Sequence, residues 1–173
     1  MVMPPSAADI DARAQKVRVL LLDVDGVLTD GRLFYLPDGQ EARVFNVRDG
    51  LGVQLLRASG LKVGLLSGKT VEVVRRRGEE LGVDLLLLGI EDKVAAFEQA
   101  LEKLGVKAEE VCYVGDDLPD LPLIRKAGLG CAVADAAPEV RSNANLILRA
   151  NGGQGAVREI CERLLKAKGK WRV

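Results

Sequence analysis

The sequence predicts an α/β protein, with one doubly wound parallel sheet that carries helices on both faces. Short runs dominated by Leu and Val alternate along the chain with segments of helical periodicity. This alternation is typical of a parallel sheet covered on both sides. Aromatic residues make up only 3% of the chain, so Leu and Val must fill the core. The length of 173 residues suits a single domain, which we place at 1–173.

The expected elements follow from these runs in chain order. Buried strands are predicted at 17–24, 61–67, 83–89, 110–116 and 130–135, with a weaker sixth at 145–149. Helices are predicted at 70–81, 93–104 and 155–168, where apolar side chains recur at helical spacing.

Residues 32–47 interrupt this alternation. Two short runs there flank Asp38 and Gly39, a pair that favours a tight hairpin turn. We therefore expect a β-hairpin inserted after the first strand. Its apolar side chains should be exposed, because a two-stranded ribbon has no core of its own. The stretches on either side of the next strand are too short for a folded cap domain.

Composition excludes several partners and settings. The formal net charge is +0, which gives no overall field toward nucleic acid or an anionic membrane. No apolar run is long enough to span a bilayer, and residues 1–16 lack the apolar segment of a secretory signal. We therefore expect a cytoplasmic protein that binds neither nucleic acid nor membrane.

The chain contains no histidine and three widely spaced cysteines. The lack of histidine excludes His-based triads, phosphohistidine chemistry and His-ligated metal sites. The cysteines have no metal-type spacing, and none has the Arg six residues later that cysteine-dependent phosphate chemistry needs. We expect them to be buried as small apolar side chains. Any catalysis must therefore use Asp, Glu, Lys, Ser or Thr, with a hard metal ion.

Polar residues gather at the predicted carboxyl ends of the strands, where open α/β sheets bind ligands. They are Asp23 and Asp25 after the first strand, Ser67 and Gly68 after the second, Lys93 after the third, and Asp116, Asp117 and Asp120 after the fourth. A single carboxylate at such a place is usually a helix cap. Several acids, a hydroxyl and a lysine at one edge instead provide the groups for phosphoryl transfer through an aspartyl-phosphate, including an oxygen-lined magnesium site.

The stretch DVDGVLTDG, residues 23–31, resembles the first motif of the haloacid dehalogenase superfamily. LLSG at 65–68, Lys93 and GDDLPD at 115–120 follow in the order of its second, third and fourth motifs. The resemblance covers roughly residues 17–160. It implies a Rossmann-like core and Mg²⁺ as the cofactor.

The resemblance also implies the catalytic and phosphate-binding roles. Asp23 attacks phosphorus. Asp25 protonates the leaving oxygen and then activates water against the aspartyl-phosphate. Ser67, the Gly68 N–H and Lys93 hold the phosphoryl group.

By the same resemblance, three residues bind the magnesium ion: Asp23, Asp25 through its backbone carbonyl, and Asp116. Asp117 and Asp120 support the site from nearby.

Four longer stretches of sequence resemble one subfamily of this superfamily. Residues 31–56, 111–124, 132–140 and 152–165 look like the capless subfamily of 3-deoxy-D-manno-octulosonate 8-phosphate phosphatases. This implies a small sugar acid phosphate as substrate and a place in lipopolysaccharide biosynthesis. It also implies a homotetramer assembled through the 32–47 hairpin, with the active site near a subunit interface.

Two positions depart from that subfamily. It often has Arg where this chain has Lys69, and often His where this chain has Ala137. Lys69 and Arg48 are expected as further cations that bind substrate or phosphate. Because lysine does not reproduce the bidentate contact of arginine, a nine-carbon sugar acid 9-phosphate remains an alternative substrate.

Two functions of other classes also remain open. A signalling receiver domain uses similar groups, but it carries its acidic pair on the first strand and its phospho-acceptor later, the reverse of the order here. A non-catalytic assembly module derived from a phosphatase is disfavoured, because all the chemical residues are present.

Overall fold

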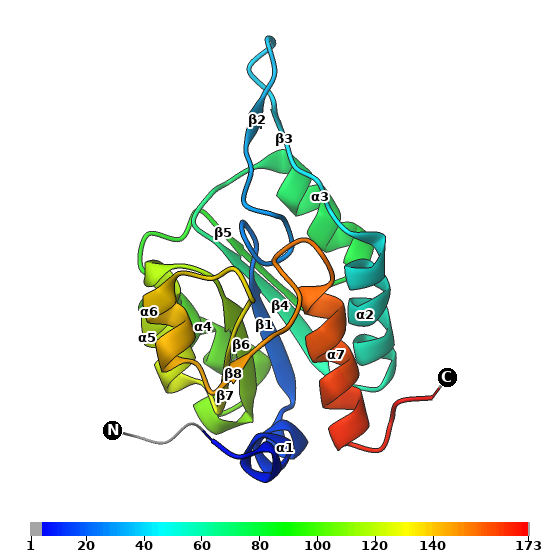
Figure 1. Cartoon of the computed structure of the whole chain (residues 1–173). Helices are drawn as coiled ribbons and strands as arrows, with labels where there is room; N and C mark the ends of the chain where they lie inside the picture. The colour runs from blue at the N-terminus through cyan, green and yellow to red at the C-terminus, as the bar shows by residue number, and fades with distance from the viewer. Residues whose placement is uncertain (1–4, 173) are drawn as a thin grey trace.

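The computed structural model describes residues 5–172 and contains a six-stranded, all-parallel sheet in the order β5-β4-β1-β6-β7-β8 (Figure 1). The strands are β1 (Val19–Asp23), β4 (Lys62–Ser67), β5 (Leu85–Leu88), β6 (Val111–Gly115), β7 (Leu129–Ala132) and β8 (Leu146–Ile147). Each predicted strand is present, trimmed or shifted by one to three residues at its ends. The doubly wound parallel sheet expected from the sequence is therefore confirmed.

Helices cover both faces of this sheet. One layer contains α2 (Val47–Ala58), α3 (Glu72–Leu81) and α7 (Ala156–Ala167), with α1 (Ala7–Lys16) beside α7. The other layer contains α4 (Lys93–Leu104), α5 (Leu121–Lys126) and α6 (Pro138–Asn143), as Figure 1 shows. The short 3₁₀ segments Ala108–Glu110 and Leu118–Asp120 precede β6 and α5. No cap domain is present among the described residues.

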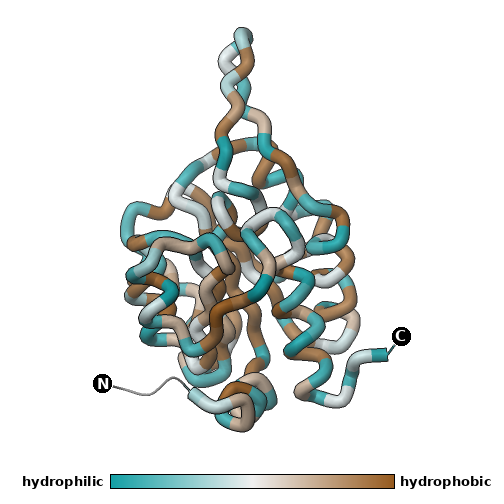
Figure 2. The backbone as a smooth tube through the Cα atoms, in the orientation of Figure 1, coloured by the Kyte–Doolittle hydropathy of each residue, from teal (hydrophilic) through white to brown (hydrophobic). Residues whose placement is uncertain are grey.

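The core lies between the sheet and these two helical layers. All five residues of β1 are buried, and Figure 2 shows the apolar character concentrated in the central strands. Tyr113 and Phe97 are the largest side chains that are fully buried. Cys112, Cys131 and Cys161 are free and buried, as predicted. Burial raises the pKa of Cys161 and of Cys112 well above the ordinary thiol value.

The inserted hairpin projects from the sheet edge that carries the strand carboxyl ends (Figure 1). Its ladder is short, because β2 (Phe34–Tyr35) pairs with β3 (Glu41–Ala42) over only two residues each. Tyr35 is 69% exposed and Val44 is 62% exposed. The apolar segments of this projection are visible in Figure 2.

The expectation that every apolar residue of 32–47 is exposed is wrong at both ends of this segment, and Leu33 at the amino end is half-buried. Phe45 is half-buried and packs against the core, with the guanidinium of Arg77 5.5 Å from its ring centroid. Val47 already belongs to α2. The base of the hairpin is therefore anchored to α3, and only its outer part is free.

Among residues 5–172, no helix is both long enough and apolar enough to cross a bilayer. The expectation for a secretory signal concerns a segment whose residues 1–4 lie outside the described range.

Candidate active site

Asp23 occupies the centre of the sheet edge because β1 is the central strand of the site. β1 pairs in parallel with β4 on one side and with β6 on the other, and Asp23 is its last residue. Its side chain is buried, and its Oδ1 accepts a 2.6 Å hydrogen bond from Lys93 Nζ. The neighbouring strand ends therefore place their own side chains around this carboxylate.

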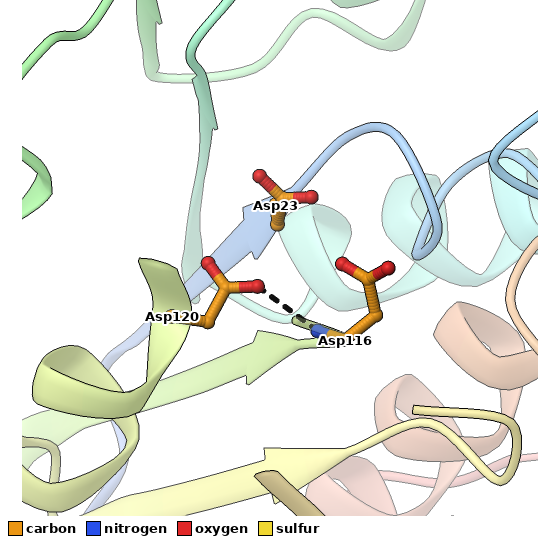
Figure 3. Close-up of side chains that lie close together, drawn as sticks. All are labelled: Asp23, Asp116 and Asp120. Carbon is orange, nitrogen blue, oxygen red and sulfur yellow. Dashed lines mark hydrogen bonds between the residues drawn. The ribbon is translucent and has the colours of Figure 1, made fainter. Parts of the chain in front are cut away.

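Asp116 follows β6 and faces Asp23 across the edge (Figure 3). Burial, followed by the charge of Asp120, raises the pKa of Asp23 to about 7, although the charge and hydrogen bond of Lys93 act in the opposite direction. Burial, followed by the charge of Asp23, raises the pKa of Asp116 to about 8. A buried and a half-buried carboxylate that repel each other are stable as anions only if a cation lies near them.

Three carboxylates are close enough to share one ion. Oxygen atoms of Asp23, Asp116 and Asp120 lie within 4.8 Å of one another. Figure 3 shows these three side chains grouped around one space. These donors are all oxygens, which suits a hard cation such as Mg²⁺. The residues present therefore fit the expected metal.

Asp120 is already occupied by other donors. Its Oδ1 accepts from the Tyr113 hydroxyl at 2.6 Å and from Lys93 Nζ at 2.5 Å. Its Oδ2 accepts from the backbone N–H groups of Asp116, at 2.9 Å, and Asp117, at 3.3 Å. Asp23 and Asp116 thus have carboxylate oxygens left for a metal, whereas both oxygens of Asp120 already accept hydrogen bonds.

Gly26 makes the approach of Asp116 possible. Its φ of +95° favours glycine, and a Cβ at this position would overlap the Asp116 carboxylate. The Gly26 N–H donates to the buried Thr29 hydroxyl at 3.2 Å, which fixes the loop after β1. The glycine of the first motif is therefore required by the close approach of the fourth motif.

Ser67 ends β4, one residue beyond the position that pairs with Asp23. Its side chain is buried, and its Oγ accepts a 3.2 Å hydrogen bond from the backbone N–H of Lys69. Gly68 and Lys69 are exposed in the loop that follows. This loop therefore presents a hydroxyl beside Asp23 and a cation farther out.

Lys93 is the first residue of α4, and the side chain of Asp92 caps this helix. Burial lowers the pKa of Lys93, but the charges and hydrogen bonds of Asp23 and Asp120 outweigh it and leave the pKa raised. Lys93 is therefore a fixed cation between two carboxylates.

The remaining predicted residues lie at the periphery. Asp117 is exposed and accepts from the Leu118 N–H at 2.8 Å, so it caps the 3₁₀ turn that carries Asp120. Arg48 is exposed on the first turn of α2.

Asp25 is half-buried two residues beyond Asp23, and it contacts a residue that was not predicted from the sequence. Its Oδ1 accepts a 2.7 Å hydrogen bond from Nε of Arg43, which lies just after β3. A charged residue between Ala42 and Val44 gives no signal of burial in the sequence. Tyr113 was also missed, although a tyrosine inside an aliphatic strand indicates that its hydroxyl has a buried partner.

Comparison with known proteins agrees with this geometry. A family model described as haloacid dehalogenase-like hydrolase matches residues 46–128. The 3-deoxy-D-manno-octulosonate 8-phosphate phosphatase of Escherichia coli K12 is 45% identical over 166 residues, which are 96% of this chain and 88% of that protein.

Solved structures agree as well. The Moraxella catarrhalis phosphatase of the same description, in complex with magnesium, phosphate and KDO, has a TM-score of 0.92 at 38% identity, covering 95% of this chain and 94% of that one. A cobalt-bound relative from Haemophilus influenzae has a TM-score of 0.89 at 40% identity, covering 91% and 92%.

The fold and the acidic sheet edge define a phosphoric monoester hydrolase of the haloacid dehalogenase-like class. Within that class, the chain belongs to the family of 3-deoxy-D-manno-octulosonate 8-phosphate phosphatases. The family resemblance inferred from the motifs is therefore confirmed, and the receiver and assembly-module alternatives are not favoured.

Proposed function

We propose that this protein hydrolyses 3-deoxy-D-manno-octulosonate 8-phosphate to the free sugar acid and phosphate, with Mg²⁺ as cofactor. The observation that carries this proposal is the meeting of Asp23, Lys93, Asp116 and Asp120 at one sheet edge. The names of the relatives supply the substrate, and the magnesium, phosphate and KDO of one relative's structure support both cofactor and products.

Two residues perform the covalent chemistry. A carboxylate oxygen of Asp23 bonds to phosphorus as the bond from phosphorus to the sugar oxygen breaks. Asp25 gives its proton to that leaving oxygen, and the free sugar acid departs. Asp25 then removes a proton from water as the water oxygen bonds to phosphorus, which releases phosphate and restores Asp23.

The remaining groups stabilise charge. Ser67, the Gly68 N–H and Lys93 hold the phosphoryl oxygens, where Lys93 is kept cationic by its two carboxylate partners. Asp23, the Asp25 carbonyl and Asp116 would hold the magnesium ion, and Asp117 and Asp120 would support them. When bound, the ion neutralises Asp23 and Asp116 and offsets negative charge on the phosphoryl group.

Lys69 and Arg48 lie outside this centre on exposed segments, where they face the part of the substrate that carries its carboxylate and hydroxyls. Lys69 provides a point charge and cannot make the bidentate contact of an arginine. The length of the sugar acid is therefore the substrate feature to test. A phosphate-release screen over eight- and nine-carbon sugar acid phosphates should give the highest kcat/KM for the eight-carbon compound. A higher kcat/KM for the nine-carbon 9-phosphate would contradict the proposed eight-carbon substrate.

The nucleophile is tested by Asp23→Asn. The amide keeps the shape of the carboxylate but cannot attack phosphorus, so turnover should fall to the level of a blank. Circular dichroism should match that of the wild type. Substantial phosphate release by a verified preparation would contradict the assignment.

Assembly and location complete the proposal. The outer hairpin exposes Phe34, Tyr35 and Leu36, which are 44%, 69% and 44% exposed. These side chains are suited to burial against copies of the same chain, in a homotetramer whose active sites lie near subunit interfaces. The enzyme acts in the cytoplasm, on a small sugar phosphate.

A further inference from the structure

Arg43 is a buried cation at the base of the hairpin. Its side chain is 0% exposed, and all three guanidinium nitrogens have partners. Nε donates to Asp25 Oδ1 at 2.7 Å, Nη2 to Glu41 Oε2 at 2.8 Å, and Nη1 to the Ala42 carbonyl at 3.1 Å. A buried guanidinium whose three nitrogens all donate hydrogen bonds has little freedom to rotate, so it can hold its partner in a fixed orientation.

The Arg43 side chain binds one carboxylate oxygen of Asp25 and leaves the other free. Within residues 5–172, Arg43 is the one side chain that hydrogen-bonds the Asp25 carboxylate. Oδ2 therefore remains available to a substrate or a water, while Oδ1 is fixed. The carboxylate is 24% exposed and would otherwise be free to turn toward solvent.

We propose that Arg43 is a positioning residue that fixes the Asp25 carboxylate for proton transfer, so that the hairpin base is part of the catalytic machinery. The inference rests on the acid/base role of Asp25 given above. Arg43 does not touch the phosphoryl group. It sets where Oδ2 lies when the bond from phosphorus to the leaving oxygen breaks and that oxygen takes the proton.

A purely structural role predicts something different. If Arg43 only attached the hairpin to the sheet, its loss would lower activity toward all substrates to the same degree. A positioning role predicts a loss that depends on the leaving group, because good leaving groups need little protonation. The dependence of kcat/KM on leaving-group acidity separates the two roles, since kcat/KM includes the first phosphoryl transfer but not the later hydrolysis.

The experiment compares wild type, Arg43→Gln, Arg43→Lys and Arg77→Gln with magnesium on substituted aryl phosphates and a primary alkyl phosphate. We expect Arg43→Gln to lower kcat/KM about 10-fold or more for the alkyl phosphate and less than about 3-fold for the nitrophenyl phosphate. Arg43→Lys can still donate a hydrogen bond to Asp25, so its loss of kcat/KM for the alkyl phosphate should lie between those of wild type and Arg43→Gln. Arg77→Gln removes a second arginine at the hairpin base that does not contact Asp25. This variant should leave the dependence of kcat/KM on leaving-group acidity unchanged.

A double-mutant cycle tests whether Arg43 acts through Asp25. In the Asp25→Asn background, the further change Arg43→Gln should alter kcat/KM by less than about 2-fold, because its partner is already disabled. Full additivity, or a uniform loss across leaving groups, would overturn the inference. If Arg43→Gln fails to fold, Arg43→Lys carries the same comparison, and a slope equal to that of wild type then counts against the proposal.

These measurements distinguish a failure of the acid role of Asp25 from a failure of the positioning role of Arg43. If Asp25→Asn itself shows no leaving-group dependence, the acid role of Asp25 is wrong. If Asp25→Asn shows that dependence and the Arg43 variants do not, Asp25 keeps its role and the positioning inference alone is rejected.

Discussion

Asp120 shows how hydrogen bonds can surround a buried carboxylate. Two backbone N–H groups, a tyrosine hydroxyl and a lysine surround its oxygens. These donors compensate for the hydration that the Asp120 carboxylate loses on burial. Asp116 differs, because no described side chain pairs with its carboxylate. The two residues stand four positions apart in one motif, yet one stabilises the site and the other needs a cation.

The cost of leaving Asp116 uncompensated should appear in the stability of the metal-free protein. Its pKa of about 8 exceeds the ordinary value of 3.8, so the folded form holds a proton that the unfolded form releases. Stability from this group is therefore lost as pH rises from about 4 to about 8. Asp116→Asn removes the charge, and its stability advantage over wild type should grow across this window.

Urea unfolding with chelator at about pH 5 and about pH 8.5 measures this difference. Asp117→Asn, at the exposed neighbouring position, is the control. An advantage of Asp116→Asn that is equal at both pH values would show that burial of this carboxylate has no such cost.

At the residue scale, the sequence located the site because strand ends converge. Asp23, Ser67, Lys93 and Asp116 each follow a recognisable apolar run, and parallel strands bring their carboxyl ends to one edge. Arg43 could not be found in this way. Its burial depends on how a loop folds back over the sheet, and neither periodicity nor motif spacing specifies that contact.

Among the elements, the glycine-rich loop before α7 packs directly against the loop that follows β1. A Cβ on Gly152 would overlap the backbone carbonyl of Gly26, and one on Gly153 would overlap the backbone near Thr29 and Asp30. The Gly153 N–H also donates to the Val27 carbonyl at 2.9 Å. The chain thus uses its last helix to support the loop after its first strand.

Gly152→Ala should therefore impair both stability and turnover. The added methyl must displace backbone, which costs on the order of 1–3 kcal/mol of unfolding free energy. It should also lower kcat, because the displaced loop carries Asp25. Gly60→Ala is the control, since its methyl enters open space and only its φ of +95° is unfavourable. Equal activity of the two variants in a phosphate-release assay would contradict the supporting role.

The hairpin yields a prediction about assembly. Phe34→Asp with Tyr35→Asp places charge on the exposed outer strand, so light scattering should detect smaller species than for wild type. Turnover of the sugar acid phosphate should fall more than turnover of an aryl phosphate. Ile147→Asp, on the edge strand β8, is a matched change of a 43% exposed apolar residue and should leave the mass unchanged. A wild type that is monomeric and fully active would refute this assembly.

Element boundaries followed the sequence where periodicity was strong. The α4 helix spans 93–104 as predicted, because its apolar face and its Asp92 cap agree. The helices α5 and α6 were not predicted, since segments of six residues show too little periodicity. The α1 helix was also not predicted, although Ser6 and Asp9 form a capping box that marks its start.

For the whole molecule, sheet order explains why one edge holds all the chemistry. Strands β4 and β6 flank β1, and the chain winds in opposite directions from this point. Helices on opposite faces leave an opening at the carboxyl ends, which is the usual ligand site of such sheets. Without a cap domain among residues 5–172, that opening faces outward beside the hairpin.

The metal prediction belongs to this scale, because the ion joins groups from several strands. Chelation should abolish turnover, and added Mg²⁺ should restore it and raise the Tm. Ca²⁺ should raise the Tm but inhibit, because its larger and looser shell allows both oxygens of Asp23 to bind the ion and leaves none to attack phosphorus. Full turnover in excess chelator, or with Ca²⁺ alone, would contradict the prediction.

The three buried thiols make this protein convenient for site-directed spectroscopy. Cys112, Cys131 and Cys161 are sheltered from solvent, and burial keeps Cys112 and Cys161 in the unreactive protonated form. A maleimide dye should therefore not react with the natural cysteines, and it should label one cysteine introduced at the hairpin tip, for example by Asp38→Cys. Energy transfer between donor- and acceptor-labelled chains would then report subunit exchange during turnover, with all three natural cysteines kept.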